Sequence, residues 1–216
     1  MPKEDEKKRI KIRFTKMHAA IIFVILATVA ATYVYASNSS AVFSCDFKDV
    51  SLNFGVDYTR CAYRGAVLNF RASLKEAAAR VPVKPGVNEV ATTIGSAWVE
   101  NITIVYKASE NNDTAKYYNL EAFEIANKLK TIMLADGVDN VGIDAKPLSA
   151  YNRTDYAQLP GQIQHPLIAI MPPEFANQTL VYAAPEHVVY ISAVSDKDFD
   201  LAVAQFIMSV LRIQLQ

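Results

Sequence analysis

Two of the three histidines in this sequence are placed where they could take part in acid–base or metal chemistry. His165 and His187 each come directly before a short apolar run that has the composition of a strand. If the starts of these strands lay side by side, the histidines with Glu174 or Glu186 would form a metal site or an acid–base pair. Histidines exposed in turns are the simpler interpretation. An extracytoplasmic hydrolase or metal-dependent enzyme is therefore an alternative to the leading hypothesis given below.

The short motifs that carry well-understood chemistry are absent from the 216 residues. There is no Gly-x-Ser-x-Gly, His-Glu-x-x-His, Gly-x-x-x-x-Gly-Lys-Ser/Thr or Gly-x-Gly-x-x-Gly sequence. Asp136, Asp139 and Asp144 lie close together, but their spacing does not match a calcium-binding loop. We expect no catalytic residue, no cofactor and no metal.

Tyrosine is unusually common, with 11 residues. Four of them flank or lie in polar sequence and could present stacking rings to a glycan or a partner protein: Tyr117, Tyr118, Tyr151 and Tyr156. The last two belong to residues 149–164, the longest irregular stretch and hence the default place for function. Packing in the core is an equally good explanation for several of these rings.

The only two cysteines, Cys45 and Cys61, are close in the sequence. In an oxidising compartment they would form one disulfide, worth about 3 kcal/mol in the chain-entropy model. Two buried free thiols are the alternative. A metal site is disfavoured because no further cysteine or paired histidine supplies the remaining ligands.

Acceptor sequences for N-glycosylation also suggest an external location, since more of them occur than chance predicts. Asn38 begins one, but it lies against the apolar segment described next. The other four are the predicted glycosylation sites: Asn101, Asn112, Asn152 and Asn177.

Residues 17–36 contain no Asp, Glu, Lys or Arg. Twenty residues of helix rise about 30 Å, the thickness of the hydrocarbon core of a bilayer. Residues 1–16 carry seven Lys or Arg against three acids, whereas residues 37–216 carry fifteen against nineteen. By the positive-inside rule, the N-terminus lies in the cytoplasm and the C-terminal part lies outside the cell membrane. Cleavage after Ala36 is an alternative that leaves the location of the domain unchanged.

The chain is thus expected to have four parts. They are a basic cytoplasmic tail (1–16), a transmembrane signal anchor (17–36), a tether with a disulfide loop (37–61) and an extracytoplasmic domain (62–216). The overall charge of zero hides this polarity and gives no indication of a nucleic-acid partner.

Hydrophobic periodicity and capping residues predict an α/β domain with a mixed sheet. The most regular helix spans 117–135 and stops at Gly137, and a second begins after Ser195 and runs to about 212. Shorter helices are expected at 73–81, behind a capping box, and within 86–97. The expected strands are 66–70, 101–107, 138–145, 166–171, and a hairpin of 179–183 with 187–194.

Several of these segments resemble membrane-anchored surface proteins of archaea whose function is unassigned. The resemblance rests on structural motifs and would cover most of 62–212. It implies a location and no activity, and it transfers no site residue. The segments that carry it are 70–77, 81–83, 122–126, 165–168, 187–191 and 198–202.

The leading hypothesis is therefore a single-pass membrane protein, anchored by residues 17–36. Its outer domain would have a non-enzymatic role in interaction or envelope structure and would contact another envelope protein or a glycan. A pilin-like subunit is a further alternative, because pilins also place an apolar helix before a globular head. Met17 and His18 between Lys16 and the apolar core depart from the pilin cleavage pattern.

Overall fold

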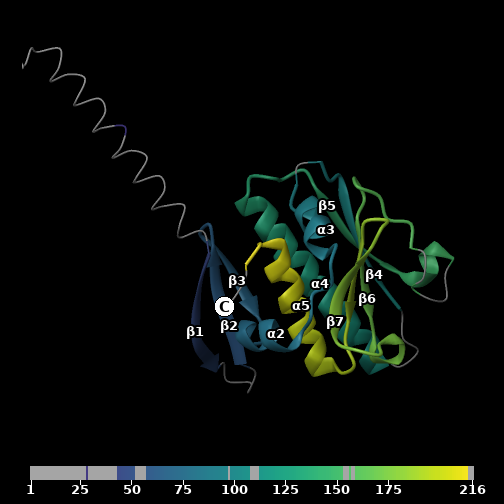
Figure 1. Ribbon diagram of the computed structural model, residues 1–216, viewed down its shortest axis with the longest axis horizontal. Coiled ribbons are helices and arrows are strands. Elements are labelled where there is room, and N and C mark those ends of the chain that lie inside the picture. The colour runs from purple at the N-terminus through teal and green to yellow at the C-terminus, as the bar shows by residue number, and fades with distance from the viewer. Residues whose placement is uncertain are drawn as a thin grey trace, which may run out of the picture. The chain divides into compact units, whose positions relative to one another are not determined.

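The computed structural model describes residues 43–51, 57–96, 98–107, 112–152, 156 and 159–213, together with Thr28 (Figure 1). Residues 43–216 cluster as one unit, and residues 1–42 form another. The predicted tail and, apart from Thr28, the predicted transmembrane segment lie outside the described residues. In the part of the chain that is described, no helix has the length and apolarity needed to cross a bilayer.

A five-stranded mixed sheet forms the centre of the domain, as the sequence predicts. Its order is β5-β4-β6-β8-β7. The first four of these strands are parallel, and β7 runs antiparallel to β8. Their bounds are β4 (Asn101–Tyr106), β5 (Gly142–Pro147), β6 (Leu167–Met171), β7 (Leu180–Ala184) and β8 (Val188–Ser192).

Three helices cover one face of this sheet. They are α3 (Val87–Ile94), α4 (Asn112–Ala135) and α5 (Asp196–Val210), of which α4 packs on β4 and β5, and α3 and α5 pack on β7 and β8. Successive residues of a strand point to opposite faces, so isoleucines in alternate positions of β4, β6 and β8 meet these helices. Each fully buried side chain of this kind stabilises the fold by about 1.5–3 kcal/mol. The isoleucines are Ile102, Ile104, Ile168, Ile170 and Ile191.

Irregular chain covers the opposite face of the sheet. Two 3₁₀ turns, η1 (Leu148–Tyr151) and η2 (Pro173–Phe175), flank this region. Tyr156 and Leu159 pack with residues of β4, β6 and β8 into a second apolar cluster. The polar stretch 149–164 therefore contributes buried side chains to the core.

A second, three-stranded antiparallel sheet consists of β1 (Phe43–Ser51), β2 (Asp57–Tyr63) and β3 (Ala66–Phe70). Figure 1 shows α4 and α5 between the two sheets. Cys45 and Cys61 are paired across β1 and β2 and form the predicted disulfide. Neither β1 nor β2 is predicted by the sequence, and the expected boundary at 62 falls inside β2.

The helices begin and end largely where the sequence predicts. Ser73 caps α2 (Leu74–Arg80) and Ser195 caps α5; in each case the side-chain oxygen accepts a hydrogen bond from a backbone N–H three residues on. Helix α4 is followed by Gly137, whose φ of 79° is left-handed. Its backbone N–H bonds close a Schellman motif, Gly137 to Leu134 and the next residue to Met133.

Candidate functional site

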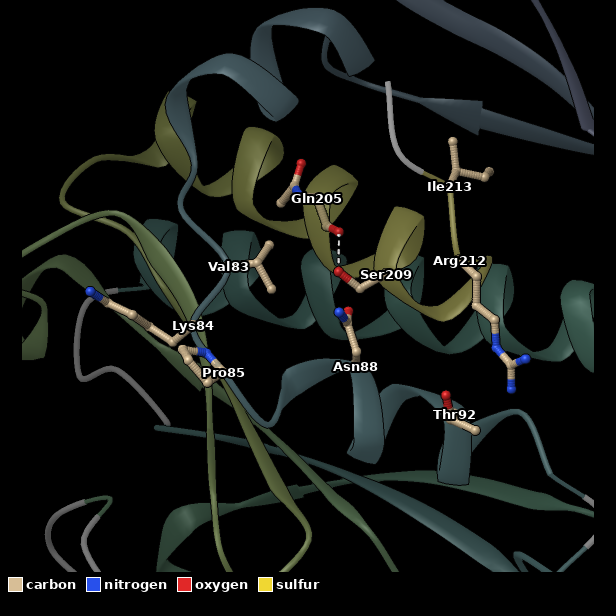
Figure 2. A pocket seen from close by; sticks show the side chains of 9 residues that line it. All are labelled: Val83, Lys84, Pro85, Asn88, Thr92, Gln205, Ser209, Arg212 and Ile213. Carbon is tan, nitrogen blue, oxygen red and sulfur yellow. Dashed lines mark hydrogen bonds between the residues drawn. The ribbon is translucent and has the colours of Figure 1, made fainter. Parts of the chain in front are cut away.

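A cavity of about 590 Å³ opens between the C-terminal half of α5, helix α3 and the turn that precedes α3 (Figure 2). This volume falls within the range of about 300–1,000 Å³ typical of small-molecule sites. Its lining is mixed: amide, hydroxyl and cationic side chains lie beside three apolar ones. The lining residues are Val83, Lys84, Pro85, Asn88, Thr92, Gln205, Ser209, Arg212 and Ile213.

The turn that forms one wall of this cavity is held by backbone bonds to β7. The N–H of Val181 donates to the carbonyl of Pro82 at 3.0 Å, and the N–H of Lys84 donates to the carbonyl of Val181 at 2.9 Å. The chain then reverses into α3 at Gly86, whose φ of 90° suits glycine. These hydrogen bonds to β7 hold the turn in place, so this wall of the cavity is fixed.

The other wall belongs to α5 and presents polar atoms toward α3. Ser209 is only 8% exposed, and its hydroxyl donates to the backbone carbonyl of Gln205 at 3.1 Å. The Gln205 Oε1 atom is buried and accepts no hydrogen bond from any described residue. Figure 2 shows the Asn88 amide pointing toward Ser209 and the Arg212 guanidinium extending toward Thr92. The cavity thus gathers hydrogen-bonding groups from two helices.

The charge of the lining is positive. Lys84 and Arg212 are its ionisable members, and no Asp or Glu lines the cavity. Among the described residues, no carboxylate lies within ion-pair distance of either cation. Lys84 extends away from the Asn88–Ser209 pair, so Arg212 is the cation directed along the cavity (Figure 2). Such a lining suits an anion or a polyol and has no ligand set for a metal ion.

A second cavity of about 510 Å³ lies near the start of α5. Its arginine, Arg80, is already occupied by ion pairs to Glu76 and Asp198. Asn177, one of the predicted glycosylation sites, belongs to its lining. A sugar attached there would lie over this cavity and leave the α3–α5 cavity free.

A group of buried and partly buried charges joins the end of β3 to α4 and α5. Arg71 donates to Glu121 Oε1 at 2.7 Å and lies 3.5 Å from Asp200 Oδ1. Glu124 is 3.8 Å from Arg71 and pairs with Lys128 at 2.8 Å. The Glu121 side chain has no exposed surface. We call these five residues the Arg71 cluster.

The Arg71 cluster holds more acids than bases. Burial, together with the neighbouring charge of Asp200, raises the pKa of Glu121 to about 8. Burial likewise raises the pKa of Asp200 to about 6. Glu121 Oε2 and Asp200 Oδ1 accept no hydrogen bond from the described residues, so one proton shared between these two carboxyl groups would satisfy both. Neither cavity is lined by Arg71, Glu121 or Asp200, and the cluster serves to join secondary-structure elements.

The histidines do not meet in a cleft. His165 lies 3.7 Å from Glu100, and both side chains are largely exposed. His187 precedes β8 with a φ of 55°, and its backbone carbonyl accepts from Leu167. Neither histidine lines a cavity described above, and the described residues contain no group of three His, Cys, Asp or Glu able to hold a metal. His165 comes before β6 and Glu174 comes after it, so the two residues lie at opposite ends of this strand.

The four predicted tyrosines do not form one surface. Tyr118 and Tyr156 are 2% and 4% exposed and belong to the core. Their rings pack edge-on against Phe199 and Phe175, respectively. Tyr117 is half-buried and donates to the carbonyl of Asp196, and Tyr151 packs against the apolar cluster under the irregular cover. The prediction of an exposed tyrosine surface is corrected accordingly, because the apolar bodies of these rings are used in packing.

The predicted glycosylation sites differ in their access to solvent. Asn152 and Asn177 are exposed, and the side chain of Asn112 lies outside the described residues. Asn101 is half-buried in β4, and its amide nitrogen donates to Thr103 at 3.2 Å and to Asp144 at 3.3 Å. Glycosylation stays a prediction, with Asn152 and Asn177 as the accessible candidates.

The α3–α5 cavity is not predicted by the sequence, because its two walls come from segments about 120 residues apart. The left-handed φ of 56° at Arg212 is a local backbone feature of this cavity. Comparison with known proteins does not supply a function: no family model, no curated protein and no solved structure matches this chain.

Proposed function

We propose that this chain is a single-pass membrane protein whose residues 43–216 act outside the cell membrane as a non-enzymatic binding module. The observation that carries the proposal is the disulfide between Cys45 and Cys61. Disulfides between paired strands persist in oxidising compartments and are rare in the cytosol. The charge-free residues 17–36, behind a basic tail, supply the anchor in this proposal.

A binding role agrees with the polar groups that the fold leaves accessible. The α3–α5 cavity presents hydrogen-bonding groups and a cation without an ion-pair partner among the described residues. Its hydroxyl groups and its lysine have no histidine or carboxylate beside them in the lining to serve as a general base. Recognition of a polar ligand therefore suits this site better than turnover of a substrate.

The redox state and membrane association of the native protein test the proposal. Membranes and soluble fractions are separated, and a thiol-reactive polymer is applied before and after reduction. We expect the protein in the membrane fraction, extractable only by detergent, with both cysteines protected until a reductant is added. Recovery in the soluble cytosolic fraction with both thiols reactive would overturn the proposal.

Glycosylation gives an independent test of the external location. Replacing Asn152 or Asn177 by Gln is expected to remove one glycan each, because both side chains are exposed. Replacing Asn101 by Gln serves as the control and is expected to leave the glycan mass unchanged, because that amide is hydrogen-bonded within the sheet. Mass spectrometry of the intact protein measures the difference. A glycan on Asn101 would contradict this assignment.

A further inference from the structure

The last turn of α5 ends with an arginine in a backbone conformation that favours glycine. Arg212 has a φ of 56°, and its N–H donates to the carbonyl of Ser209 while the N–H of Ile213 donates to that of Met208. This bond pair defines a Schellman motif, in which glycine is the usual residue at the left-handed position. The same motif ends α4 with Gly137. The chain thus uses glycine at one helix end and arginine at the other.

An L-residue with a side chain is disfavoured in the left-handed region, and such residues concentrate at binding sites. The left-handed turn directs the Arg212 side chain back along the cavity toward α3 (Figure 2). No described carboxylate forms an ion pair with this guanidinium. Ion pairing among the described residues therefore does not explain the arginine.

We propose that the α3–α5 cavity binds a small anion that also carries hydroxyl groups, of which an acidic sugar is the simplest example. Arg212 would pair with the carboxylate through two parallel N–H bonds. Thr92, which is exposed near the Arg212 guanidinium, would bond one ligand hydroxyl (Figure 2). Asn88 and Ser209 would bond further hydroxyls, since both present polar atoms to the same space.

The apolar part of the lining also suits this class of ligand. Val83, Pro85 and Ile213 contribute aliphatic surface to a cavity whose remaining members are polar. A pyranose ring has C–H groups on its faces and hydroxyls at its edge, so it can contact both kinds of surface at once. A bare inorganic anion would leave this aliphatic surface uncovered. This inference rests on the proposed binding role but is independent of the membrane location.

Calorimetric titration of the full-length protein in a mild detergent tests the inference. The probes are glucuronate, glucose and acetate, which carry both features, the hydroxyls alone and the carboxylate alone. We expect saturable binding of glucuronate and at least tenfold weaker binding of glucose and acetate, because each lacks one set of contacts. Absence of glucuronate binding, or equal binding of acetate, would overturn the inference.

Variants then assign the binding to the cavity. Arg212→Gly keeps the backbone conformation and is expected to weaken glucuronate binding at least tenfold, since it removes the paired cation. Lys84→Met should weaken it less than threefold, because that ammonium group points away (Figure 2). Arg60→Met, at an exposed position of β2, is a control for net charge and should leave the affinity unchanged. Unaltered affinity in Arg212→Gly would locate the binding elsewhere and overturn the inference. If the protein is oxidised and membrane-bound but does not bind glucuronate, this inference fails while the proposed location stands.

Discussion

Arg71 and Arg212 are both arginines, but their surroundings differ. Arg71 is partly buried at the end of β3, with 16% of its side chain exposed, and lies within 3.8 Å of three carboxyl groups. Arg212 is exposed at the end of α5 and lines a cavity without an acid. The backbone of Arg212, and not that of Arg71, is in the left-handed region. The comparison teaches that Arg71 is fully engaged by carboxyl groups of the domain, whereas Arg212, the arginine that we propose for ligand binding, has no such partner among the described residues.

The largest expected effect comes from removing the partly buried Arg71. Arg71→Met leaves Glu121 and Asp200 without their cation in a site that water does not reach freely. Breaking a buried pair in this way costs about 3–5 kcal/mol of unfolding free energy, measurable by urea denaturation. Arg60→Met, at an exposed position of β2, is the matched control and should cost almost nothing. Equal stability of the two variants would show that the Arg71 cluster does not join β3 to the helices.

A smaller effect is expected from the proton held by the Arg71 cluster. The folded pKa of Glu121, about 8, exceeds its usual 4.5 because the side chain is buried. The folded state therefore binds a proton that the unfolded state releases between these values. This contribution to stability is complete below pH 4.5 and is lost as the pH rises to about 8. Asp200 acts in the same direction up to about pH 6.

Denaturation at several pH values measures this effect. Glu121→Gln removes the titrating group, so the fall in stability between pH 5 and 8 should become shallower than in the unaltered protein. Glu89→Gln, at an exposed position of α3, should retain the full slope. A slope that is the same in all three proteins would rule out a shared proton in the Arg71 cluster.

The smallest effect concerns the two helix ends. Arg212→Gly relieves the left-handed arginine and should stabilise the domain by about 1 kcal/mol, or about 2–4 °C in Tm. Gly137→Arg makes the reverse change after the end of α4, where an added Cβ atom would meet no neighbouring atom within 4 Å. It should destabilise by a similar amount. If Arg212→Gly lowered Tm, the arginine would be a structural residue and the comparison with Arg71 would fail.

Local features of the sequence predict much of the fold. The 3.6-residue periodicity and Gly137 locate most of α4 and its end, and Ser195 locates the start of α5. The hairpin of β7 and β8 follows from two apolar runs around a turn. In each case the deciding interactions lie within a few residues of one another.

Contacts between distant segments are what the sequence does not reveal. Strand β1 mixes charged and apolar residues, and its identity depends on pairing with β2. Tyr118 and Tyr156 are amphipathic, so their composition is compatible with either a surface or the core. The α3–α5 cavity is formed only when Asn88 and Ser209 are brought together by the packing of two helices. The cysteine pair is the one feature of the chemistry that the sequence predicts and the fold confirms.

The backbone hydrogen bonds between residues 82–84 and Val181 affect how copies of the protein meet when they are crowded together. An outermost strand with free backbone groups can add a strand from a neighbouring chain. Here β7 already shares hydrogen bonds with the passing segment, and the opposite border, β5, carries Asp144, Lys146 and Pro147. Both lateral borders of the sheet therefore resist pairing with another copy. Copies of the domain could therefore be packed side by side at high density without pairing through the borders of this sheet.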